Sequence, residues 1–167
     1  KGAPMTVNFG VGVPPVTTVE QHREFAKANK DITTVGVDIY YPAMVVNGPG
    51  VEAHFGEKGE LLFFSASDRE IPFKMKEEFD AISAKMRREG KVMPALIPKG
   101  FEVWLMGEKE NYGLPGLRFV KGGFDFPIDR PADMITVMNL FYYYPPHLTA
   151  VALVEFEKRL ADGGILL

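Results

Sequence analysis

Glycine, aspartate and asparagine residues at the ends of apolar segments are the residues of this chain best suited to hold a ligand. Gly10 and Gly12 follow the apolar segment 5–9, Asp38 ends the segment 32–38, and Asn139 ends the segment 132–139. Glycine lets the backbone approach a ligand closely, and a carboxylate at a strand end can accept two hydrogen bonds from a ribose. Together these residues predict a site for an adenosine-containing cofactor.

A strand–helix–strand pattern near the start of the chain would position the first of these residues. Residues 5–9 and 32–38 are apolar or β-branched, which is typical of strands. Thr18 and Gln21, three residues apart, predict a capping box at the start of the helix between them. Two strands joined by a helix run parallel, so both carboxyl ends would lie at the same edge of a sheet.

A second pattern of this kind ends the chain. A strand at 133–139 precedes an amphipathic helix at about 148–160 and a last strand that begins after Asp162. Parallel sheets bind ligands beyond the carboxyl ends of their strands. The two patterns therefore predict an α/β fold whose candidate residues, Asn139 included, gather at one edge.

Residues 42–116 interrupt this alternation and predict an α+β insertion after the second strand. Residues 51–55 and 61–65 flank a Gly-rich turn and predict a hairpin. The segment from Pro72 to Gly90 predicts an amphipathic helix whose basic and acidic residues alternate, as on a solvated face. We expect a single domain over residues 1–167, with this insertion inside it.

The composition limits the classes of function. The 167 residues suffice for one domain with a sizeable core, and a formal net charge of -3 argues against a nucleic-acid partner. Cysteine is absent and the three histidines lack the spacing of metal ligands, so we expect no metal site. No apolar run approaches the roughly 20 residues of a membrane span, so we expect a soluble, cytoplasmic protein without a membrane partner.

Several segments together resemble the Rossmann-like S-adenosylmethionine-dependent methyltransferases. Residues 8–12 are similar to the glycine loop of that family, and residues 35–38 to its second strand, whose acidic end binds the ribose. Residues 118–125 resemble the segment beside the adenine. The strongest likeness is at 132–167, where a strand ending in Asn runs into an aromatic, proline-tipped loop, a helix and a Gly-Gly turn.

This resemblance implies a Rossmann-like parallel core, S-adenosylmethionine as the cofactor and an unidentified methyl acceptor. It covers roughly residues 4–41 and 114–167 without the family's usual last two strands, so a protein partner or second subunit is expected to complete the sheet. Carried over residue by residue, it assigns cofactor contacts to Asn8, Gly10, Gly12, Asp38, Gly123, Phe124, Asp125, Asn139 and Phe141. It assigns the catalytic positions, which border the transferred methyl group, to Asn139 and Tyr142.

Two other functions stay open at this point. The run Val13-Pro14-Pro15 replaces the third glycine of the loop, which favours a non-catalytic binding or assembly module with residues 42–116 as its interaction surface. Gly10 and Gly12 followed by a strand-end Asp38 also fit ribose recognition by a nicotinamide-dependent oxidoreductase, although that motif has a third glycine.

Overall fold

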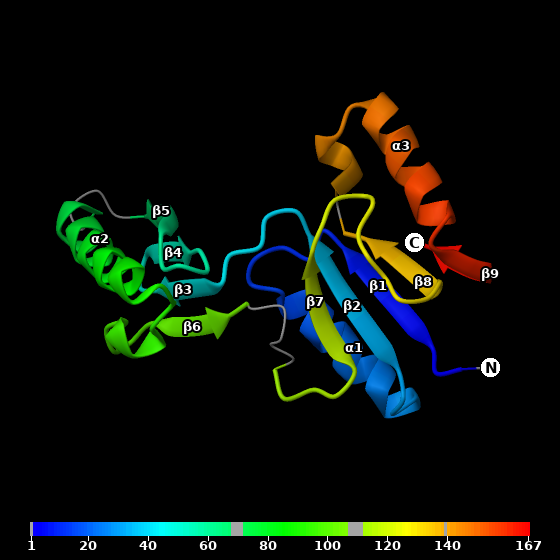
Figure 1. The fold of residues 1–167 in the computed structure, drawn as a ribbon, viewed down its shortest axis with the longest axis horizontal. Helices are drawn as coiled ribbons and strands as arrows, with labels where there is room; N and C mark the ends of the chain where they lie inside the picture. Colours follow the sequence, from blue (N-terminus) through cyan, green and yellow to red (C-terminus); the bar gives the residue numbers. More distant parts are fainter. Residues whose placement is uncertain (1, 68–71, 107–111, 139) are drawn as a thin grey trace. The chain divides into compact units, whose positions relative to one another are not determined.

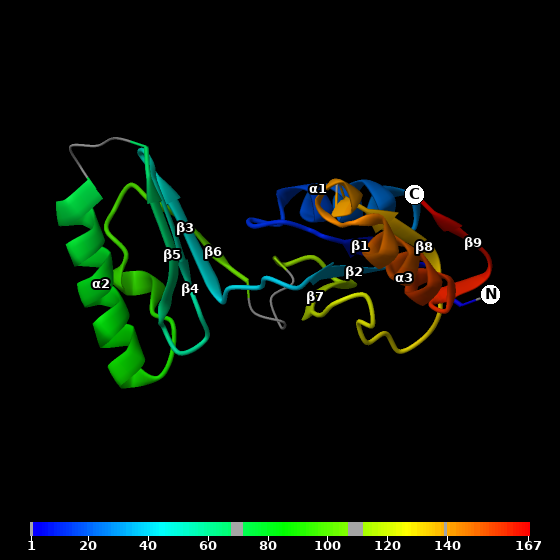
Figure 2. The same ribbon diagram turned by 90° about the horizontal axis from the view of Figure 1, so that it is seen from above.

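A computed structural model describes residues 2–67, 72–106, 112–138 and 140–167. The chain forms two compact units, one made of Lys1–Tyr40 with Glu108–Leu167 and the other of Tyr41–Gly107. Each unit has its own sheet (Figures 1 and 2). The segment expected as an insertion, residues 42–116, contains most of the second unit, whereas residues 112–116 belong to the first.

The first unit contains a five-stranded sheet of order β7-β2-β1-β8-β9. Its strands are β1 (Met5–Phe9), β2 (Thr33–Asp38), β7 (Leu117–Lys121), β8 (Ala132–Val137) and β9 (Leu160–Leu166). Every neighbouring pair is parallel, so all five carboxyl ends lie at one edge (Figure 1). The expectation of an α/β architecture with a parallel sheet is confirmed.

Two helices, α1 (Val16–Ala28) and α3 (Pro146–Glu157), cover opposite faces of this sheet. Successive side chains of a strand point to opposite faces. On β1, Asn8 donates a hydrogen bond to Gln21 of α1, whereas the ring of Phe9 packs against Phe156 of α3. Adjacent residues of one strand therefore contact different helices.

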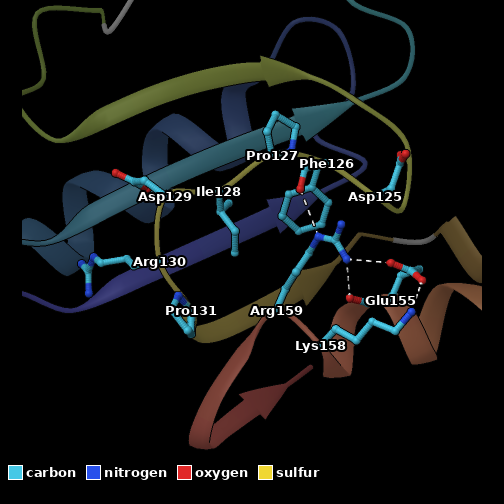
Figure 3. A pocket seen from close by; sticks show the side chains of 10 residues that line it. All are labelled: Asp125, Phe126, Pro127, Ile128, Asp129, Arg130, Pro131, Glu155, Lys158 and Arg159. Carbon is cyan, nitrogen blue, oxygen red and sulfur yellow. Dashed lines mark hydrogen bonds and ion pairs between the residues drawn. The ribbon is translucent and has the colours of Figure 1, made fainter.

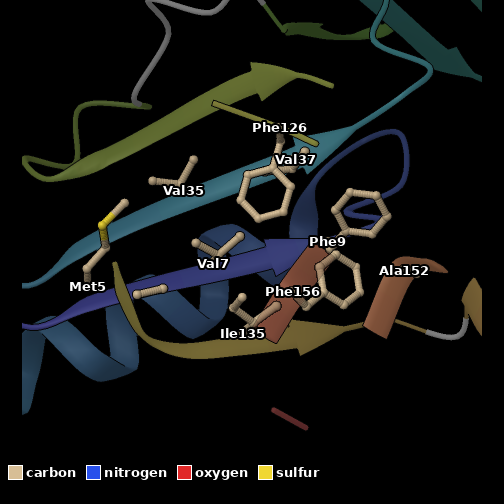
Figure 4. Close-up of a cluster of buried hydrophobic side chains, with 10 residues drawn as sticks. Met5, Val7, Phe9, Val35, Val37, Phe126, Ile135, Ala152 and Phe156 are labelled. Atoms are coloured by element: carbon tan, nitrogen blue, oxygen red, sulfur yellow. The ribbon is translucent and has the colours of Figure 1, made fainter. Parts of the chain in front are cut away.

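The core between the sheet and α3 is rich in aromatic rings (Figure 4). The connection from β7 to β8 contains no helix, and its Phe126 is fully buried against the sheet. The ring centroids of Phe9 and Phe126 are 5.7 Å apart, and those of Phe9 and Phe156 are 5.0 Å apart. Because aromatic side chains bury large apolar areas, Phe126 covers part of the sheet that a helix would otherwise cover.

The predicted capping box at the start of α1 is wrong. The helix begins at Val16, after Pro15, and no side chain caps its first turn. The Oε1 atom of Gln21 instead accepts a hydrogen bond of 2.6 Å from Nδ2 of the buried Asn8. A buried amide needs a hydrogen-bond partner, so this tertiary contact takes Gln21 away from the local motif.

His22 is buried and joins α1 to β2 and to the segment before β7. Its Nδ1 lies 2.8 Å from Thr34 Oγ1, and its Nε2 lies 3.1 Å from the carbonyl oxygen of Pro115. A carbonyl oxygen can only accept, so the neutral ring carries its proton on Nε2 and accepts at Nδ1. Burial lowers the pKa of His22 from 6.5, and the hydrogen bond to Pro115 partly opposes this shift.

We therefore expect the free energy of unfolding to fall as the pH drops below about 6.5. In this window the unfolded chain protonates His22 while the folded chain keeps it neutral, so acid favours unfolding until the lowered pKa of the folded state is passed. Urea unfolding at a series of pH values measures this dependence. His22→Gln cannot titrate and is expected to reduce the slope; equal slopes in both proteins would contradict a buried neutral histidine.

The second unit is a four-stranded antiparallel sheet of order β5-β4-β3-β6 with one long helix. Its elements are β3 (Met44–Gly48), β4 (Val51–Phe55), β5 (Leu61–Ala66), α2 (Pro72–Glu89), the short η1 (Pro94–Leu96) and β6 (Glu102–Leu105). Helix α2 packs on one face, where the Phe79 ring contacts Phe55 and Phe64 at centroid distances of 6.0 and 5.7 Å. The predicted hairpin and amphipathic helix are confirmed.

Candidate functional site

The loop after β1 contains two glycines, of which Gly10 lies close against the Leu140 side chain and Gly12 faces open space. Gly10 and Gly12 have φ angles of +76° and +72°, which residues with a Cβ rarely adopt. The Gly10 amide donates to the Val37 carbonyl oxygen at 2.8 Å, so the loop lies against the end of β2. A Cβ at Gly12 would meet no atom within 4 Å, so the Gly12 backbone borders open space.

Asp38, at the end of β2, holds this loop in place. Its Oδ2 accepts a hydrogen bond of 3.1 Å from the Gly12 amide, and its Oδ1 accepts one of 2.9 Å from the Tyr40 amide. Each carboxylate oxygen has a second lone pair, and the side chain is only partly buried. The carboxylate can therefore organise the loop and still accept hydrogen bonds from the hydroxyl groups of a ligand.

A pocket of about 450 Å³ opens at the carboxyl ends of β1 and β8. From these neighbouring strands the chain leaves in opposite directions, from β1 to β2 and from β8 to β9. Open parallel sheets bind ligands at such a switch point, and small-molecule pockets commonly measure roughly 300–1,000 Å³. The lining residues are Gly10, Val11, Thr17, Thr136, Val137 and Met138.

Buried polar atoms without hydrogen-bond partners lie on these same elements. Thr136 of β8 is directly opposite Asn8 of β1, whose side chain is fully buried beneath the loop. Among the described residues, no atom bonds to Asn8 Oδ1, Thr18 Oγ1 or Thr136 Oγ1. Buried polar atoms are normally hydrogen-bonded, so these three unpaired atoms, one of them on the pocket-lining residue Thr136, are exceptions to that rule.

The residues predicted to contact adenine, Gly123, Phe124 and Asp125, lie in different surroundings in the structure. The Gly122 amide donates to the Asp38 carbonyl oxygen at 3.0 Å, which places the start of the β7–β8 connection, and Gly123 after it, beside the end of β2. The Phe124 ring instead lies 5.6 Å from the ring of Phe9, against the core. The backbone next to Gly123, rather than the Phe124 ring, is therefore the part of this segment nearest to Asp38.

Asp125 lines a second pocket of about 560 Å³, together with residues 126–131 and the end of α3 (Figure 3). In this pocket Arg159 donates to the Phe126 carbonyl oxygen at 3.0 Å and to Glu155 Oε2 at 2.8 Å. Hydrogen bonds from Lys158 and then from Arg159 lower the pKa of Glu155. Because these charges are already paired, we assign this pocket the structural role of fastening the β7–β8 connection to α3.

The segment after β8 brings aromatic side chains to the edge of the sheet that carries the glycine loop. Tyr142, in the short helix η2 (Leu140–Tyr143), is 91% exposed, whereas Phe141 packs partly against the core. Asn139 lies outside the described residues, so its predicted role stays a prediction. Tyr142 therefore lies on the surface of the first unit, in the segment that follows β8.

The structure thus brings together Gly10, Gly12 and Asp38, which the sequence singled out, and adds two residues that it did not. Thr17 and Thr136 line the pocket from the first turn of α1 and from the next-to-last position of β8. The alternation of side chains along β8, which places Thr136 on the face that Asn8 occupies, was the available signal.

Comparison with models of known protein families finds none that matches this chain, and comparison with curated proteins finds no significant match. Among the described residues, no group of three or more His, Asp or Glu side chains could hold a metal ion. In the same part of the chain, no helix has both the length and the apolar character needed to cross a bilayer.

Proposed function

We propose that this protein binds S-adenosylmethionine on a Rossmann-like core and transfers its methyl group to an acceptor. The observation that carries the proposal is the hydrogen bond between the Gly12 amide and the Asp38 carboxylate, in a loop that also borders the pocket at the carboxyl ends of β1 and β8. The strand order supports it: counted along the first unit, the sheet reads 3-2-1-4-5, the order of doubly wound sheets that bind dinucleotides.

The groups at this edge of the sheet match the parts of such a cofactor. Asp38 would accept hydrogen bonds from the ribose hydroxyl groups. The positive end of the α1 dipole lies just after the glycine loop and would favour the methionine carboxylate. Thr17, which is exposed and lines the pocket at the carboxyl ends of β1 and β8, would offer its hydroxyl group to the same methionine moiety.

In this reaction the residues of the chain would mainly position the substrates. When bound, S-adenosylmethionine supplies a methyl group on a positively charged sulfonium sulfur. The neutral thioether that remains after the transfer is the leaving group. The protein then needs to hold an acceptor in line with that methyl group and to keep water away. Tyr142, which is exposed in the short helix after β8, would border the acceptor, and a general base is required only if the acceptor must first lose a proton.

Calorimetric titration of the purified chain with S-adenosylmethionine, S-adenosylhomocysteine and NAD tests this proposal. We expect both sulfur compounds to bind with equimolar stoichiometry and NAD to produce no binding heat. Binding of NAD alone would replace methyl transfer by the nicotinamide-dependent alternative. Failure of a folded chain to bind any of the three would overturn the proposal and favour the non-catalytic module.

A further inference from the structure

Strand β5 of the second unit has an unusually unprotected edge. It is the last strand of its sheet, and among the described residues no strand pairs with its outer side. Its sequence, LLFFSA, contains no charge and no proline, and Leu62 and Phe63 are 48% and 43% exposed. Natural proteins usually protect such edges with charges, prolines or bulges. The bulge of β5 lies opposite His54 and Phe55 and therefore affects only the amino-terminal end of the strand.

The register with β4 shows which backbone groups of β5 point outward. The Ser67 amide donates to the Gly50 carbonyl oxygen at 2.8 Å, and the register continues with Ala66 opposite Val51 and Ser65 opposite Glu52. Hydrogen-bonded and non-hydrogen-bonded pairs alternate in an antiparallel ladder. Ser65 therefore bonds to β4, while the amide and carbonyl groups of Phe64 and Ala66 face away from the sheet.

A groove lies directly beside these outward groups. It measures about 520 Å³ and is lined by Phe64 and Ala66 of β5 and by Phe73 of α2, which is 85% exposed. Lys76, Glu77 and Asp80 form its charged side. A free strand edge next to an apolar groove is the arrangement that accepts an extended strand: backbone hydrogen bonds hold the strand, and alternate side chains fill the groove.

We propose that the occupant is β5 of a second copy of this chain, paired antiparallel about a two-fold axis at Ser65. In this register Phe64 and Ala66 of the second copy form a hydrogen-bonded pair, in which each residue donates its amide to the carbonyl oxygen of the other. The two-fold axis generates the same pair from Ala66 and Phe64 of the second copy. The strand suits itself as a partner because it brings no charge to the edge and only a small serine to the axis.

The charges beside the groove fit the same arrangement. An axis perpendicular to the sheet leaves both α2 helices on one face, so the two grooves join and the two Phe73 side chains become covered. Lys76 pairs with Asp80 of its own helix at 2.7 Å, so Glu77 is the groove carboxylate that can approach the Lys76 of the second copy across the axis. The pairing concerns the second unit alone and is independent of the proposed methyl transfer.

Disulfide trapping in the full chain tests both the dimer and its register, because the native sequence has no cysteine. Residues at a non-hydrogen-bonded antiparallel position have Cα atoms about 4.5 Å apart, within the span of a disulfide. We expect Ser65→Cys to form cross-linked dimers under mild oxidation. Ser67→Cys changes an exposed serine directly after the strand, which would be about 14 Å from its symmetric copy, and should stay monomeric on a denaturing gel.

A second measurement uses sedimentation equilibrium without oxidation. We expect a concentration-dependent dimer for the wild type and an association about 30-fold weaker for Ala66→Pro, which loses an outward amide on each copy but no bond to β4. Thermal unfolding confirms that the variants are folded. A strictly monomeric wild type, equal trapping of both cysteine variants, or a dimer unaffected by Ala66→Pro would overturn the proposal.

Discussion

Phe156→Ala is expected to lower the free energy of unfolding of the first unit by about 3–5 kcal/mol. Phe156 of α3 is fully buried, and its ring contacts those of Phe9, Phe124 and Phe126 at centroid distances of 5.0, 6.1 and 6.2 Å. Truncation removes this apolar contact and leaves a cavity that the surrounding rings cannot fill without moving. Urea unfolding followed by far-ultraviolet circular dichroism measures the loss.

Val154→Ala is the matched control, since Val154 lies on the same helix with half of its side chain exposed. We expect it to cost less than about 1 kcal/mol. Trp104 of β6 is the sole tryptophan, so its fluorescence follows the second unit separately. A loss for Phe156→Ala no larger than that for Val154→Ala would contradict the central place of this ring in the core.

Asp38→Ala is expected to weaken the binding of S-adenosylhomocysteine about 100-fold, if the proposed function holds. The carboxylate would lose two hydrogen bonds to the ribose, and hydrogen bonds to a charged group are among the stronger ones in proteins. The substitution also frees the Gly12 and Tyr40 amides, which the carboxylate now binds. Calorimetric titration measures the affinity.

Two further variants separate these effects. Asp31→Ala removes an exposed carboxylate just before the other end of β2 and should leave the affinity unchanged. Asp38→Asn keeps one oxygen for the loop but loses the charge, so we expect an affinity between those of the wild type and Asp38→Ala. Wild-type affinity in Asp38→Ala would show that the carboxylate serves the loop alone.

Local patterns were sufficient to predict most elements, because helices and strands bury side chains at fixed intervals. The helix after Pro72 is confirmed as α2, and Phe79 and Met86, seven residues apart along it, are fully buried. The boundary at the end of α3 was wrong: the expected helix runs to residue 160, but β9 begins at Leu160. Pairing of Leu160 with Ala132 of β8, followed by a shift of register, overrides the helical pattern there.

The sequence by itself determined the α/β class, the hairpin of the second unit and the positions of the glycine loop and Asp38, since each depends on residues a few positions apart. Only the tertiary structure decided that Gln21 binds Asn8 and that Thr136 lies opposite Asn8. The same holds for the burial of Phe126 in place of a helix. These contacts depend on which strands become neighbours and on which buried polar groups need partners. Local patterns do not predict them, because the residues involved are far apart in the chain.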